Sequence, residues 1–217
     1  MFYKDGDYVR NHLRCARCNS IPRWRALIYV LSEFIPDWRD LTIHESSPDG
    51  AASEKLATEC AAYTPTFFYP DVEGGTSKDG VRCENLEAQT FPDEVFDIVV
   101  TQDVLEHVFD PAAAFRDIAR TLKPGGAHVF TVPWFYWQPT LTRAVLRDGE
   151  VQHLVEPDYH GDPIDPRGTL VVTEWGPDLC DFIYESSALT TTPVRVLDHH
   201  RGIEGQFIEV FISRKGS

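Results

Sequence analysis

The chain has 217 residues and a net charge of −14, with 42% hydrophobic and 25% charged residues. This length and balance suit one globular domain with a substantial core, and they exclude a disordered or fibrous protein. The 34 acidic residues outnumber the 20 basic ones, which argues against a nucleic-acid partner or an anionic membrane surface. Several arginines near the N-terminus are interpreted as a solvated surface, with a nucleic-acid grip as the alternative: Arg10, Arg14, Arg17, Arg23 and Arg25.

The cysteines and the apolar runs indicate the cellular compartment in which the protein is expected. Five scattered cysteines do not suit a disulfide framework. No apolar run approaches the roughly 20 residues of a membrane helix, and the N-terminus lacks the apolar region of a secretory signal. We therefore expect a cytoplasmic protein with no membrane partner. Cys15 and Cys18 form a single CxxC, for which a packed turn is favoured over zinc or redox chemistry, so no metal is assigned.

Residues 1–40 form an N-terminal segment that contains this CxxC and one helix. The helix lies between Pro22 and Pro36, and its apolar positions recur at helical spacing: Trp24, Leu27, Ile28, Leu31 and Ile35. A short strand follows at 41–45, then a helix at 51–62. Further strands are predicted at 64–69 and 81–83.

The centre of the chain has the clearest pattern. Residues 96–100, FDIVV, are a continuous apolar run typical of a strand buried on both faces of a parallel sheet. An apolar stripe from Phe115 to Leu122 predicts a helix, which Lys123–Gly126 (KPGG) ends before a strand at 128–132. Alternating strands and helices predict a parallel sheet covered by helices.

Residues 133–170 are rich in aromatic residues and little periodic, and are interpreted as a lid or substrate-binding insert. A last helix is predicted near 179–183. Strands at 194–198 and 207–213, joined by a tight connection, complete an antiparallel edge hairpin. The prediction is a doubly wound, Rossmann-like α/β domain at 41–217, with a mostly parallel seven-stranded sheet.

The block at 85–133 resembles a known family. It contains, in order, Asn85–Leu86, an FPDEVFDIVV run, a VLEH turn and an LKPGG stop. In this order and spacing the segment resembles class I methyltransferases that use S-adenosylmethionine (SAM), of the group called methyltransferase type 11. The resemblance implies SAM as the cofactor. It also implies methyl transfer to a hydroxyl, amine or carboxyl of a small molecule. A degenerate fold that acts as a binding module is the alternative.

The resemblance also implies cofactor-binding residues. Asn85 and Leu86 occupy the adenine position, although Asn85 could instead only shape a turn. Gln102 and Asp103 follow the central strand and are expected beside the methionine part of SAM. Asp71 is the candidate for the ribose diol, with a neighbouring tyrosine or a backbone group as the alternative.

The loop after the first strand of the domain departs from the family pattern, because it has one glycine, Gly50, where the family has several. Glu45 is expected to face the ammonium group of SAM. Ser46 and Ser47 are expected to donate to its carboxylate, close to a helix N-terminus. Alternatively, Ser47 or Asp49 only caps that helix.

Three histidines are candidates for a catalytic base. His160 is the first choice and His153 the second, because both lie in the aromatic insert. The alternative for His160 is a turn packed against the sheet. His107 follows the central strand, where a structural role is favoured over that of a base.

Overall fold

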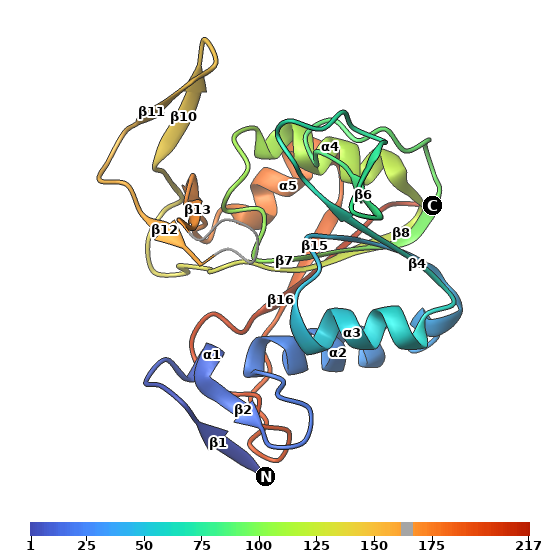
Figure 1. The fold of residues 1–217 in the computed structure, drawn as a ribbon, viewed down its shortest axis with the longest axis vertical. Helices are drawn as coiled ribbons and strands as arrows, with labels where there is room; N and C mark the ends of the chain where they lie inside the picture. The colour runs from blue at the N-terminus through green and yellow to red at the C-terminus, as the bar shows by residue number, and fades with distance from the viewer. Residues whose placement is uncertain (162–166) are drawn as a thin grey trace.

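The computed structural model describes residues 1–161 and 167–217, and its centre is a sheet between two layers of helices (Figure 1). Within the described residues this sheet has eight strands in the order β15-β16-β8-β7-β3-β4-β6-β5. Strands β4, β3, β7 and β8 run parallel, β6 is parallel to β4, and β16 is antiparallel to both neighbours. The strands are β3 (Thr42–Ser46), β4 (Ala62–Phe67), β5 (Ser77–Lys78), β6 (Val81–Cys83), β7 (Phe96–Gln102), β8 (Leu122–Thr131), β15 (Thr190–Val194) and β16 (Val210–Arg214).

The predicted Rossmann-like α/β fold is confirmed. Six of the seven expected strands lie in this sheet close to their predicted positions, the seventh is displaced along the chain, and the two-residue β5 extends the sheet at its edge. Helices α2 (Pro22–Phe34) and α3 (Gly50–Glu59) cover one face, whereas α4 (Pro111–Thr121) and α5 (Leu179–Ser187) cover the other (Figure 1). Ile98 and Val100 pack in the first core and Val99 in the second, because successive strand residues point to opposite faces.

The link between α4 and β8 differs from the prediction in one point, because KPGG lies inside β8 (Leu122–Thr131) and not between the helix and the strand. Asp110 accepts a hydrogen bond from the backbone of Ala113 and caps the start of α4. The helix ends at Thr121, immediately before the segment that contains KPGG. A Cβ on Gly126 would lie 3.0 Å from the carbonyl oxygen of Asp97, so glycine allows β8 to approach β7 closely here.

The edge hairpin was predicted with the wrong boundaries. Its first strand is Thr190–Val194 rather than 194–198, and residues 195–209 form a long connection instead of a tight one. Pairing with β16 sets this register, with Thr190 opposite Arg214 and Val194 opposite Val210. Pro193 is tolerated because β15 is an edge strand with one side unpaired.

The N-terminal segment folds beside the carboxyl ends of the parallel strands. It contains β1 (Phe2–Lys4), α1 (Val9–His12), β2 (Leu13–Cys15) and, after α2, a short 3-10 helix (Trp38–Asp40). The interpretation of its arginines as a solvated surface is wrong for Arg10, which is only 4% exposed. It is also wrong for Arg25, which donates to the carbonyl oxygens of Leu13 and Gly202. Both side chains lie inside the fold because they donate hydrogen bonds to acceptors there, the Asp103 carboxylate for Arg10 and backbone oxygens for Arg25.

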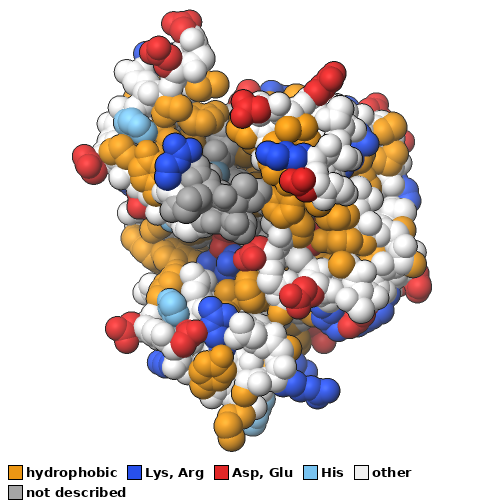
Figure 2. Space-filling model, viewed as in Figure 1, with side chains coloured by type: hydrophobic (Ala, Val, Ile, Leu, Met, Phe, Trp, Pro, Cys, Tyr) orange, Lys and Arg blue, Asp and Glu red, His pale blue; other side chains and the backbone are white. Residues whose placement is uncertain are grey.

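The insert contains two small antiparallel pairs, β10 (Ala144–Arg147) with β11 (Glu150–His153) and β12 (Tyr159–His160) with β13 (Thr169–Leu170). Its strand β9 (Leu141–Thr142) pairs with β14 (Thr173–Glu174), which follows the insert. The β10–β11 hairpin projects away from the sheet (Figure 1). Apolar side chains gather on this lobe in Figure 2, and Leu146, Val151 and Tyr159 are exposed there. None of the helices in the described residues is long and apolar enough to cross a bilayer.

Candidate functional site

A large cavity lies where the parallel strands end, between the sheet, the N-terminal segment and the insert. Its volume of about 1640 Å³ exceeds that of a pocket for one small ligand, roughly 300–1,000 Å³. The cavity therefore has room for a cofactor and a second molecule. It brings together ten of the predicted site residues: Ser46, Ser47, Asp71, Asn85, Leu86, Gln102, Asp103, His107, His153 and His160.

Glu45, at the end of β3, lies below the floor of this cavity and is fully buried. Its Oε1 accepts hydrogen bonds from Ser53 at 2.8 Å and from Gln102 at 2.7 Å, and its Oε2 accepts one from Tyr63 at 2.6 Å. Burial raises the pKa of Glu45, and these three donors oppose the rise. Direct contact of Glu45 with the ammonium of SAM stays a prediction, because its side chain is fully buried and is not among the residues that line the cavity.

The turn from β3 into α3 has an unusual backbone. Ser47 has a φ of 54° and Gly50 a φ of 67°, both in the left-handed region. A Cβ on Gly50 would lie 2.1 Å from the ring of Trp24, so the single glycine of this turn is required by close packing. Asp49 is the N-cap of α3, but its side chain makes no capping hydrogen bond within the described residues. Its carboxylate is therefore not the cap that the sequence alternative proposed.

Asn85 lies just after β6 and forms a turn. Its Oδ1 accepts a hydrogen bond from the backbone N–H of Glu87 at 3.0 Å, as the turn alternative predicted. A carbonyl oxygen has a second lone pair, so this bond still leaves Asn85 able to accept from a ligand. Leu86, the next residue, is buried, whereas Asp71, in the loop after β4, is exposed and lines the same cavity.

Asp103 follows β7 and joins the N-terminal segment to the sheet. Its carboxylate accepts two hydrogen bonds from Arg10, both at 2.8 Å, one from Arg23 at 2.9 Å and one from Thr131 at 2.8 Å. Burial opposes ionisation, but the charges of Arg10 and Arg23 outweigh it and hold the pKa of Asp103 far below its usual value. The carboxylate therefore fixes two arginines at the cavity wall, and Tyr8 and Asn11 line the wall beside them.

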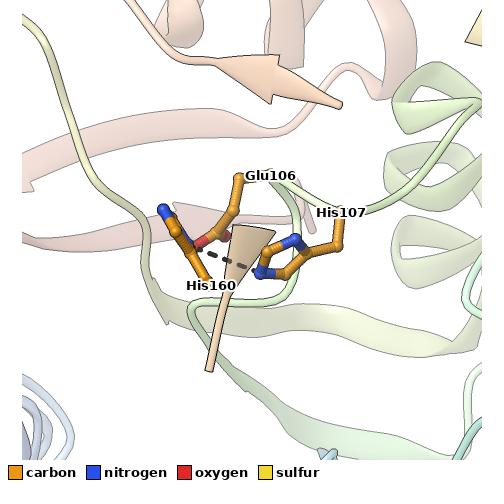
Figure 3. Close-up of side chains that lie close together, drawn as sticks. All are labelled: Glu106, His107 and His160. Carbon is orange, nitrogen blue, oxygen red and sulfur yellow. Dashed lines mark ion pairs between the residues drawn. The ribbon is translucent and has the colours of Figure 1, made fainter. Parts of the chain in front are cut away.

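A second polar cluster joins the β7 loop to the insert (Figure 3). His107 Nε2 lies 3.9 Å and His160 Nδ1 3.8 Å from Oε1 of Glu106, and the two rings meet edge to face with their centroids 5.3 Å apart. The Glu106 carboxylate raises the pKa of His160. His107 donates from Nδ1 to the backbone oxygen of Leu170 at 2.8 Å, so it has the structural contact that the sequence analysis favoured.

The CxxC at the N-terminus takes part in no comparable cluster. Cys18 Sγ lies 3.2 Å from the Ser20 hydroxyl, and the backbone N–H groups of Arg17 and Cys18 lower the pKa of the Cys15 thiol. In the described part of the chain, the one group of three or more metal-capable side chains is the cluster of Figure 3.

Part of the chain matches a known protein family. Residues 50–130 match the family model described as "Methyltransferase domain". This match covers less than half of the chain. The predicted resemblance to class I SAM-dependent methyltransferases is confirmed, and the match supports SAM as the cofactor of this methyltransferase domain.

Two curated proteins resemble the chain over a short segment. The chain is 44% identical to a ubiquinone biosynthesis O-methyltransferase of Parvibaculum lavamentivorans over 45 residues, which are 21% of this chain and 18% of that enzyme. It is 56% identical to an uncharacterised methyltransferase of Schizosaccharomyces pombe over 45 residues, 21% of this chain and 16% of that protein. The matched segment thus spans less than a fifth of each relative.

Solved structures share the fold over most of the chain. A SAM-dependent methyltransferase of Mesorhizobium loti superposes with a TM-score of 0.56 at 15% identity, covering 88% of this chain and 98% of that one. A SAM-bound amino pentose methyltransferase of Micromonospora echinaspora gives 0.57 at 16% identity, covering 88% and 91%. A chain from the complex of the Haloferax volcanii Trm112 activator with a methyltransferase gives 0.57 at 14% identity, covering 90% of each.

Sequence reasoning missed Arg10, Arg23 and Glu106 as residues of the site. Arg10 meets Asp103 across 93 positions, and no local pattern indicates such a contact. Glu106 stands directly before His107 in the VLEH turn, so its position after the central strand was the signal that could have drawn attention to it.

Proposed function

We propose that the chain is a SAM-dependent methyltransferase that acts on a small molecule. The observation that carries this proposal is the cavity, in which the loops after β3, β6 and β7 converge at the carboxyl ends of parallel strands. This is where open α/β sheets bind nucleotides. The methyltransferase match at 50–130 includes the loops after β6 and β7.

We infer that Gln102 takes the place of an acidic residue at the ammonium of SAM. Gln102 lines the cavity and directs its amide nitrogen away from it, towards Glu45 and the Ser53 hydroxyl. Since the donors of the amide are used there, its carbonyl oxygen is the acceptor left for the ammonium. Glu45 then acts by fixing Gln102, one layer below the ligand.

The rest of the cavity is the proposed acceptor site. Its walls include Phe135, Leu146 and Tyr159 beside the candidate histidines His153 and His160. Apolar walls with a few polar groups suit a compact acceptor with some apolar surface. Methyl transfer from a sulfonium is an in-line displacement, so these walls would mainly align the hydroxyl, amine or carboxyl with the methyl group. The named O-methyltransferase and amino pentose methyltransferase among the similar proteins support a small acceptor.

Calorimetric titration with SAM and with its demethylated product, S-adenosylhomocysteine, tests the proposal. We expect one site per chain. Asp71→Ala should lower the affinity about 10- to 100-fold, because it removes the proposed hydrogen bond between the Asp71 carboxylate and the ribose diol. Glu73→Ala is the matched control, since Glu73 is exposed two residues away and does not line the cavity. Absence of binding by the wild-type chain would refute the proposal.

One observation favours the second candidate, a binding module without catalysis. The Glu45 carboxylate already accepts hydrogen bonds from three protein donors and is fully buried, so it does not present itself to the ammonium. Screening small phenols, amino sugars and carboxylic acids with isotopically labelled SAM separates the candidates. Tight binding of S-adenosylhomocysteine with no labelled product from any class would favour the module.

A further inference from the structure

We propose that Glu106, His107 and His160 form a binding site for one divalent transition-metal ion at the wall of the cavity. The three side chains come from two parts of the chain, the loop after β7 and strand β12 of the insert (Figure 3). Each offers one ligand atom, and these atoms lie within 4.8 Å of one another.

The Glu106 carboxylate is the feature that requires a partner. Its side chain is about 2% exposed, and neither oxygen has a hydrogen-bond partner among the described residues. An ionised carboxylate buried in this way costs several kcal/mol unless a cation or donors compensate it. The imidazole nitrogens stand at 3.8 and 3.9 Å, which is too far for hydrogen bonds.

The spacing of the cluster suits a shared ion better than direct contact. Ligand atoms around a tetrahedral zinc, with bonds of about 2.0–2.1 Å, are about 3.4 Å apart. The two separations from Glu106 of 3.8 and 3.9 Å need to close by about half an ångström, and the third, between the two histidines, is at most 4.8 Å, so side-chain rotations can bring all three atoms onto one ion.

His107 is also held in the form that a metal requires. The carbonyl oxygen of Leu170 can only accept, so Nδ1 of His107 carries a proton, and in the neutral ring the lone pair is then on Nε2, which faces Glu106. A backbone acceptor on the second ring nitrogen is the usual arrangement of metal-binding histidines. The same strand pair holds the cluster together, because Thr169 pairs with His160. A few residues further along, the backbone N–H groups of Val172 and Thr173 donate to the backbone oxygen of Glu106.

The donor set indicates which ion. Two imidazoles and one carboxylate suit Zn²⁺ and its neighbours in the transition series, whereas Mg²⁺ and Ca²⁺ prefer oxygen ligands. Three protein ligands leave a coordination position open, as in catalytic zinc sites. His107 and His160 both line the cavity, so that position would face it.

This placement deepens the proposed function, on which the following step rests. A metal ion at the wall would bind an oxygen or nitrogen of the acceptor and lower the pKa of a coordinated hydroxyl, which would orient and activate the nucleophile. The acceptors selected would then carry a metal-binding group beside the atom that is methylated.

Titration with Zn²⁺ and Co²⁺, in the absence of SAM, tests the site. We expect one ion per chain by calorimetry, and visible d–d absorption from bound Co²⁺ with the signature of nitrogen and oxygen ligands. His160→Ala, His107→Ala and Glu106→Gln should each lower the affinity at least about tenfold. His160 is part-exposed, so its alanine variant is expected to fold even if Glu106→Gln does not.

Two variants are matched controls. His153→Ala removes another histidine of the cavity, and His199→Ala removes an exposed histidine 3.3 Å from the carboxylate of Glu204. Neither should change Zn²⁺ affinity. Absence of stoichiometric binding, or binding that persists in both His107→Ala and His160→Ala, overturns the metal site and leaves a simple ion pair.

The two proposals fail separately. If S-adenosylhomocysteine binds but Zn²⁺ does not, the metal site is refuted and the proposed cofactor site stands. If Zn²⁺ binds at the cluster but neither SAM nor its product binds, the proposed function is refuted, whereas the metal site stands.

Discussion

Replacing Asp103 by Asn should destabilise the protein, because the buried side chain of Arg10 then loses the carboxylate that neutralises it. Asp103 neutralises Arg10, which is 4% exposed, and Arg23, whose side chain is 16% exposed. An asparagine keeps the shape and removes the charge. Arg23 can turn towards Asp49, whose carboxylate is 3.9 Å away, whereas Arg10 is left with its hydrogen bond to the carbonyl oxygen of Phe207 and the more distant charge of Glu106.

The magnitude follows from this difference in burial. Breaking a buried ion pair by removing one partner costs about 3–5 kcal/mol, and we place Asp103→Asn in the lower half of that range because Arg23 can relax. Arg10→Met should cost less, about 2 kcal/mol, since Asp103 keeps its bonds to Arg23 and Thr131. The double variant should cost less than the sum of the two single variants, because the carboxylate and Arg10 act together.

Urea unfolding measures these differences. With a slope of about 2 kcal/mol/M, Asp103→Asn should lower the midpoint by about 1.5–2 M at an unchanged slope. Asp5→Asn is the matched control: Asp5 also pairs with an arginine, Arg14, but in an exposed position where the pair contributes little. Equal midpoints for wild type and Asp103→Asn, or strict additivity in the double variant, would refute the burial argument.

Two further predictions concern packing and acid stability. Gly50→Ala should cost about 2–3 kcal/mol, because its φ of 67° strains an L-residue and its Cβ would meet the Trp24 ring. Gly149→Ala, with a φ of 81° and open space around it, should cost about 1 kcal/mol in the same urea assay, and equal losses would contradict the packing argument. Burial lowers the pKa of His44 and of His128 to about 3, so the unfolded chain binds protons below about pH 6.5 that the folded chain does not. The free energy of unfolding should therefore fall as the pH falls from 6.5 towards 3, by up to about 1.4 kcal/mol per pH unit for each histidine. His128→Gln should remove the contribution of one histidine to this pH dependence.

Several parts of the fold follow from local sequence. Three local patterns predict an element each: the apolar run at 96–100 predicts a strand, the stripe from Phe115 to Leu122 a helix, and KPGG the end of that helix. Their alternation is enough to imply a parallel sheet, and a parallel sheet places the loops after its strands at one edge. For this reason Asn85, Gln102 and their neighbours could be assigned to one cavity before the structure was known.

The register of the last hairpin was not available from the sequence. Residues 194–198 and 190–194 both have strand composition, and cross-strand pairing with β16 selects the second. Because both segments have the composition of a strand, the local sequence does not distinguish between the two registers.

The sequence alone determined the sheet, its helices and the cavity edge, because periodicity and turn residues act over short distances. Only the tertiary structure decided which polar groups meet across it. It buried Glu45 below Gln102, joined Arg10 to Asp103, and brought His160 of the insert to Glu106. Such contacts depend on how loops that are distant in the chain dock, and the free energy of docking comes from burial and charge pairing that no local pattern records.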